Sequence, residues 1–128
     1  MSFIKQPWIG VDLDGTLAFY ESFSGPYHIG EPIKPMVNRI IAWISQGKMV
    51  KIFTARVTEG CFNKDGTPYD VQLVVKNIQD WCETHIGHKL EVTNVKDFAM
   101  TELWDDRAVR VAKNKGYPCC DYQRIGDY

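Results

Sequence analysis

The stretch Trp8-Ile9-Gly10-Val11-Asp12-Leu13-Asp14-Gly15-Thr16-Leu17 decides the fold, because an apolar run passes directly into two alternate carboxylates, a glycine and a threonine. The apolar half predicts a buried strand. Side chains alternate along a strand, so Asp12 and Asp14 point to the same side and gather at its carboxyl end. Gly15 allows a close turn there, and Thr16 with nearby backbone N–H groups can donate hydrogen bonds inward.

Two carboxylates at the end of one strand repel each other unless a proton or a cation separates them. A hard cation that prefers oxygen ligands, above all Mg²⁺, suits this position. The alternative is an ordinary strand followed by an acidic Asp-Gly turn. The hydrophobic strand before the acids and the matching segments downstream favour the metal site.

The composition predicts one globular domain that covers residues 1–128. Fifteen basic and sixteen acidic residues give a net charge of −1, so no global field recruits nucleic acid or a membrane, and an anionic substrate must be captured locally. No apolar run approaches the roughly 20 residues of a membrane span, and the N-terminus lacks a signal-peptide pattern. We therefore expect a soluble, cytoplasmic protein.

Strands and helices alternate along the rest of the chain. Apolar positions with helical spacing follow Pro35 as far as Gly47, and a second helical pattern runs from Val71 to Ile86. Further strands are expected at residues 49–53, 90–95 and 100–104, and a last helix at 109–116. This order predicts an α/β fold, a three-layer Rossmann-like parallel sheet with helices on both faces.

Two segments interrupt the alternation. Residues 18–34 carry aromatic residues and chain breakers, so we expect a flap that follows the acidic strand end. Its aromatics Tyr20, Phe23 and Tyr27 either stack on a base or pack the flap down. Residues 57–70 predict an irregular insertion with a turn at Asp65-Gly66. Neither segment is large enough for a separate cap domain.

Polar side chains follow the carboxyl ends of three strands. Asp12 and Asp14 close the first strand, Thr54 follows the second, and Asp105 and Asp106 follow the last. Ligands of an open parallel α/β sheet bind outside these ends. One aspartate before a helix can act as its N-cap, whereas two call for a second explanation. We expect these side chains to form one site.

These segments, in this order, are similar to the motifs of the haloacid dehalogenase (HAD) superfamily. Asp12-Leu13-Asp14-Gly15-Thr16 resembles the first motif of its phosphatases, and Thr54 resembles the second. Leu103-Trp104-Asp105-Asp106 resembles the strand and acid pair that complete the metal site. The third motif is a single lysine, for which Lys96 is the first choice and Lys89 the reserve. The resemblance covers nearly the whole chain.

The resemblance implies a HAD-like, Mg²⁺-dependent phosphohydrolase of the small capless type. Asp12 would attack a phosphate monoester to give an aspartyl-phosphate that water then hydrolyses, and Asp14 would act first as general acid and then as general base. An acid at position 14 also argues against dehalogenation, because a departing halide needs no proton. The implied ligands are Asp12, Asp14 through its carbonyl, Asp105 and Asp106 for the metal, and Thr54, Lys96 and Arg56 for the phosphate.

The segment around Asp105 and Asp106 indicates the class of substrate. Asp105-Asp106-Arg107, with Gly116-x-x-Cys119 after it, resembles the 3′-phosphatase half of polynucleotide kinase-phosphatases. With the open site and the aromatic flap, this favours a nucleotide or a nucleic-acid 3′ end over a sugar phosphate. The alternative is a non-catalytic phosphate-sensing or scaffold module. A nucleic acid would be contacted over one or two nucleotides by a short basic patch of Lys5, Lys34, Arg56 and Lys64.

Overall fold

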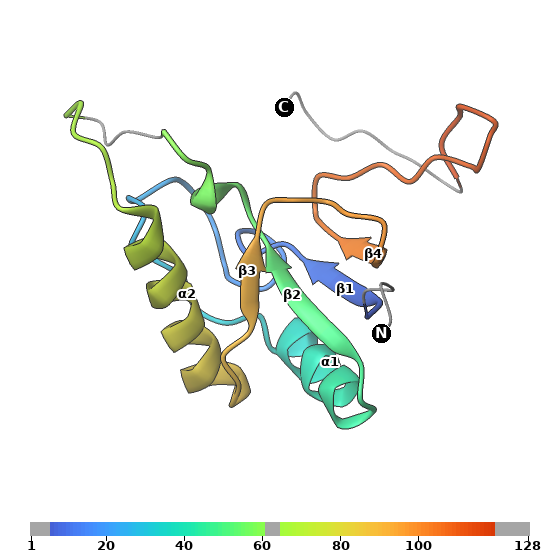
Figure 1. Cartoon of the computed structure of the whole chain (residues 1–128), viewed down its shortest axis with the longest axis horizontal. Helices are drawn as coiled ribbons and strands as arrows, with labels where there is room; N and C mark the ends of the chain where they lie inside the picture. Colours follow the sequence, from blue (N-terminus) through green and yellow to red (C-terminus); the bar gives the residue numbers. More distant parts are fainter. Residues whose placement is uncertain (1–5, 61–64, 120–128) are drawn as a thin grey trace, which may run out of the picture.

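The computed structural model describes residues 6–60 and 65–119. The strands form one parallel sheet in the order β3-β2-β1-β4 (Figure 1). The protein is therefore an α/β protein, as predicted, and its sheet is compatible with a Rossmann-like fold. The elements are β1 (Trp8–Val11), α1 (Lys34–Ser45), β2 (Met49–Phe53), the 3₁₀ turn η1 (Ala55–Val57), α2 (Val71–Ile86), β3 (Glu91–Thr93) and β4 (Met100–Trp104).

The two helices begin and end close to the predicted positions because their sequences carry the corresponding signals. Pro35 occupies the first turn of α1, where its missing N–H leaves no hydrogen bond unmade. The side chain of Asp70 caps α2 by accepting a hydrogen bond from the Gln72 N–H at 2.9 Å. Gly87 ends α2 in the left-handed conformation, with φ of 93°.

The main core lies between the helices and one face of the sheet. Val50 and Ile52 alternate along β2 and are buried with Ile40 of α1 and Ile78 of α2. Burial of each such side chain contributes about 1.5–3 kcal/mol of transfer free energy. The two helices also contact each other, which requires that both lie on this face.

The predicted helices on both faces are not found in the described residues. On the second face, Lys51 lies over the ring of Trp8 at 4.6 Å. Residues 94–99 cross that side as a loop, and the Trp8 Nε1–H donates to Asp97 Oδ1 at 2.9 Å. The prediction was wrong because this connection from β3 to β4 is too short to contain a crossover helix.

The last predicted helix, over residues 109–116, was also wrong. The segment instead turns back on itself, and the Ala112 N–H donates to the Tyr117 carbonyl at 2.9 Å. Asn114 and Gly116 have φ of 64° and 82°, values that no right-handed helix contains. The Asn-x-Gly turn signal therefore outweighs the apolar spacing on which the prediction rested.

The predicted flap, residues 18–34, is a loop closed at its base. Ala18 pairs with Pro32, and the Phe19 N–H donates to the Glu31 carbonyl at 2.8 Å. In the insertion, the Thr67 N–H donates to Asp65 Oδ1 at 3.0 Å and forms the predicted turn. Neither α1 nor α2, the α-helices of the described residues, is long and apolar enough to span a membrane.

Candidate active site

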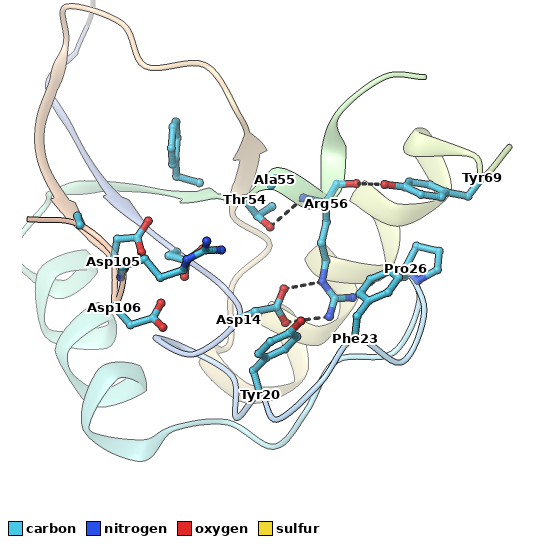
Figure 2. A pocket seen from close by; sticks show the side chains of 14 residues that line it. Asp14, Tyr20, Phe23, Pro26, Thr54, Ala55, Arg56, Tyr69, Asp105 and Asp106 are labelled. Atoms are coloured by element: carbon cyan, nitrogen blue, oxygen red, sulfur yellow. Dashed lines mark hydrogen bonds and ion pairs between the residues drawn. The ribbon is translucent and has the colours of Figure 1, made fainter. Parts of the chain in front are cut away.

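A cavity of about 560 Å³ opens at the carboxyl ends of β1, β2 and β4 (Figure 2). This is the edge at which the sequence predicts the site. Its walls come from the strand ends, the flap, η1 and the segment after β4. The lining residues are Asp12, Asp14, Tyr20, Phe23, Pro26, Phe53, Thr54, Ala55, Arg56, Tyr69, Asp105, Asp106, Arg107 and Ala108.

Three predicted acids converge at one side of this cavity. Asp12, Asp105 and Asp106 each offer a carboxylate oxygen, and these oxygens lie within 4.8 Å of one another. The Thr16 hydroxyl lies 3.3 Å from Asp12 Oδ2 and 3.2 Å from Asp106 Oδ1, and it accepts the Asp106 N–H at 3.1 Å. Thr16 therefore links the ends of β1 and β4.

The backbone brings these acids together. The Asp12 N–H donates to the Trp104 carbonyl at 2.9 Å, which continues the pairing of β1 with β4 up to the acids. Gly15 has φ of 87°, and a Cβ atom there would lie 2.6 Å from Asp106 Oδ2. Gly15 is thus required both for its conformation and for the close approach of Asp106, which follows β4.

The clustering of charge shifts the titration of Asp12. Its burial, the negative charge of Asp105 and a hydrogen bond with Asp106 raise the pKa of Asp12 from 3.8 to about 8. When all three carboxylates are ionised they repel one another, and partial burial weakens the screening of this repulsion by water. A set of hard oxygen donors in this state fits a divalent cation such as Mg²⁺, which relieves the repulsion.

Asp14 is directed away from this group and toward Arg56. Arg56 donates from Nε to Asp14 Oδ2 and from Nη2 to Asp14 Oδ1, both at 2.8 Å (Figure 2). Its Nη1 donates to the Pro26 carbonyl of the flap at 3.1 Å, and the residue is only 8% exposed. We predicted that Arg56 binds phosphate; here its guanidinium holds Asp14 and the flap. The Asp14 carboxylate therefore does not belong to the group of three acids.

Thr54 lies where β2 ends, as predicted. It is 3% exposed, it lines the cavity, and its hydroxyl accepts the Arg56 N–H at 3.2 Å. This contact caps η1 and fixes the direction in which Arg56 leaves the strand. Thr54 therefore combines a structural contact with a position on the wall of the cavity.

The structure places neither candidate lysine on the wall of the cavity. Lys96 is exposed in the loop that leaves the carboxyl end of β3, on the edge where the cavity opens. Lys89 precedes β3 at the opposite edge, and its Nζ lies 3.4 Å from Asp80 on α2. Of the two lysines, Lys96 is therefore the one at the edge of the sheet where the cavity opens.

The flap contributes two of its three predicted aromatics to the cavity. Tyr20 and Phe23 line it, and each is 44% exposed. Tyr27 instead packs the flap onto α2, since its carbonyl accepts the Asn77 side-chain amide at 2.7 Å. The sequence analysis did not place Tyr69 in the site; the only signal was an aromatic residue in the insertion.

The predicted basic patch is not assembled by the described residues. Lys5 and Lys64 lie outside them. Arg56 is buried against Asp14, and Lys34 is the first residue of α1. Within the described residues, the charge of Arg56 is therefore paired with Asp14 rather than free for an anionic ligand.

Comparison of the chain with protein-family models, with curated proteins and with solved structures found no match. The function is therefore inferred from the residues of the cavity and their contacts.

Proposed function

We propose that the protein is a HAD-like, Mg²⁺-dependent phosphohydrolase that cleaves a phosphate monoester. One observation carries the proposal. Carboxylates from the ends of β1 and β4 converge on a cavity that also holds Thr54 from β2, and a further carboxylate, Asp14, is oriented there by an arginine. These are the groups that phosphoryl transfer through an aspartate requires.

Asp12, Asp105 and Asp106 would hold the Mg²⁺ ion. Their carboxylate oxygens are close enough to share one cation, and oxygen is the ligand that Mg²⁺ prefers. The bound ion supplies the positive charge that lets an anionic nucleophile approach a phosphate dianion.

Asp12 would act as the nucleophile. Its carboxylate oxygen forms a bond to phosphorus while the ester P–O bond breaks, and Asp14 gives a proton to the departing oxygen. Asp14 then takes a proton from the water that hydrolyses the aspartyl-phosphate. Arg56 donates hydrogen bonds to both oxygens of Asp14, so it orients this carboxyl group in the cavity.

The phosphoryl oxygens would be held by Thr54 and by Lys96, whose long side chain must extend into the cavity from the loop after β3. The alcohol that leaves would belong to a nucleotide or to a nucleic-acid 3′ end. The half-exposed rings of Tyr20 and Phe23 support this choice, because a nucleobase can stack on them through its π face, which a sugar phosphate lacks.

The test is the hydrolysis of p-nitrophenyl phosphate with Mg²⁺ and with EDTA. We expect turnover with Mg²⁺. EDTA should abolish this activity, and so should the substitution Asp12→Asn. Asp80→Asn, which removes a carboxylate from the surface of α2, serves as the matched control and should retain activity. Binding of Mg²⁺ and phosphate without turnover of any phosphate ester would instead identify the non-catalytic phosphate-sensing module.

A further inference from the structure

Residues 107–119, called the basic arm below, carry a concentrated positive charge. The segment contains four basic residues and no acidic one, although the whole chain has a net charge of −1. The basic residues of the arm are Arg107, Arg110, Lys113 and Lys115.

The basic arm starts in the wall of the candidate active site. Arg107 and Ala108 line the cavity, and the Arg107 N–H donates to Asp105 Oδ1 at 2.8 Å. From there the arm leads away from the sheet (Figure 1). It is closed by the contact between Ala112 and Tyr117 described above. The arm is therefore a projecting turn with one end fixed beside the proposed catalytic acids.

Three of the four charges of the arm, those after Arg107, are not neutralised by the described part of the chain. Arg110, Lys113 and Lys115 are exposed, and none of them forms an ion pair with a described residue. Tyr117, on the same turn, is 58% exposed. Exposed cations with an exposed aromatic ring form the combination that binds single-stranded nucleic acid.

We propose that the basic arm binds the phosphate backbone of a single-stranded polynucleotide whose phosphorylated 3′ end occupies the cavity. The choice of the 3′ end rests on the proposed function. Each lysine or arginine that meets a phosphate releases counterions, which gives affinity without base recognition. An anionic membrane would also attract the charge, but the arm's origin at the cavity favours a ligand that continues the substrate.

Binding can be measured without catalysis. A fluorescent 3′-phosphorylated oligodeoxynucleotide is titrated with the full chain in EDTA at several salt concentrations. The double variant K113Q/K115Q removes two charges of the arm. K48Q/K76Q removes two exposed charges elsewhere, one after α1 and one on α2, and is the matched control.

For K113Q/K115Q we expect the slope of log K against log salt to fall by about 1.4, since each single-strand phosphate contact contributes about 0.7. Near 0.1 M salt this corresponds to an affinity loss on the order of tenfold or more. K48Q/K76Q should keep the wild-type slope. Equal slopes for the two variants, or binding to anionic phospholipid vesicles that exceeds binding to the oligonucleotide, would overturn the proposal.

A kinetic comparison then separates the arm from the proposed chemistry. In K113Q/K115Q, kcat/KM should fall at least tenfold more for the 3′-phosphorylated oligonucleotide than for a 3′-mononucleotide, mainly through KM. An equal fall in kcat/KM for both substrates would refute the proposed role of the arm in binding the polynucleotide. If the wild type binds the oligonucleotide with the expected salt dependence but hydrolyses neither substrate, the arm is supported and the proposed function fails.

Discussion

Replacing Asp12 by asparagine should stabilise the metal-free protein, and the gain should grow with pH. The native pKa of Asp12 is about 8, raised from 3.8 by burial, by the charge of Asp105 and by the hydrogen bond with Asp106. A carboxyl whose pKa is higher in the native state binds more protons when folded. Its favourable contribution to the free energy of unfolding is therefore complete below pH 3.8 and is lost as pH rises to about 8.

The size of the effect follows from the same pKa. A rise from 3.8 to about 8 sets a ceiling of about 6 kcal/mol on the stability lost between these pH values. Asp12 is only partly buried, so solvent screening reduces this to about 2 kcal/mol. Asparagine keeps the shape of the side chain and carries no charge, so the stability of the variant does not fall over this pH range.

The assay is urea unfolding in EDTA at pH 4, 6, 8 and 9, for the wild type, Asp12→Asn and the surface control Asp80→Asn. The free energy of unfolding of Asp12→Asn should exceed that of the wild type by a margin that widens up to pH 8 and then stays constant. Added Mg²⁺ should raise the stability of the wild type more than that of the variant. A margin that is independent of pH, or a variant that is less stable at pH 8, would refute the electrostatic reasoning.

Three further predictions concern other residues of the site. Lys96→Ala should lower kcat/KM on the order of a hundredfold, far more than Lys89→Ala; equal small losses would show that the third motif is misplaced. Arg56→Ala should lower kcat on the order of tenfold or more with little change in KM, because Asp14 loses both hydrogen bonds; a rise in KM alone would instead make Arg56 a phosphate ligand. Gly15→Ala should cost about 1–3 kcal/mol in thermal unfolding because of its φ of 87°, and an unchanged Tm would contradict this strain.

Regular elements were predictable where local signals and burial agree. The strand at 49–53 and the helix from Val71 to Ile86 have the predicted bounds, because alternation, a capping aspartate and a terminal glycine all act locally. The third strand was predicted at 90–95 and covers Glu91–Thr93, since strand ends depend on pairing with a neighbour. The prediction of the last helix was wrong because it took Gly116 as the end of a helix, whereas Asn114 and Gly116 form a turn.

The convergence of the acids could be predicted because parallel strands place their carboxyl ends at one edge of the sheet. The partner of Asp14 could not, since Arg56 lies 42 positions away and its direction depends on η1 and the flap. The role that we propose for the segment after Arg107 could not be predicted either. Its charge is visible in the sequence, whereas its projection from the cavity becomes visible only once the expected helix is replaced by a turn.

The most direct test of the proposed chemistry is to trap the phosphorylated enzyme. The protein is mixed with a radiolabelled phosphate monoester and Mg²⁺, quenched in acid within one turnover, and digested for mass spectrometry. We predict a phosphoryl group on Asp12 that hydroxylamine removes and that is absent from Asp12→Asn. Turnover without a labelled protein, or a label that persists in Asp12→Asn, would contradict a phosphohydrolase that works through Asp12.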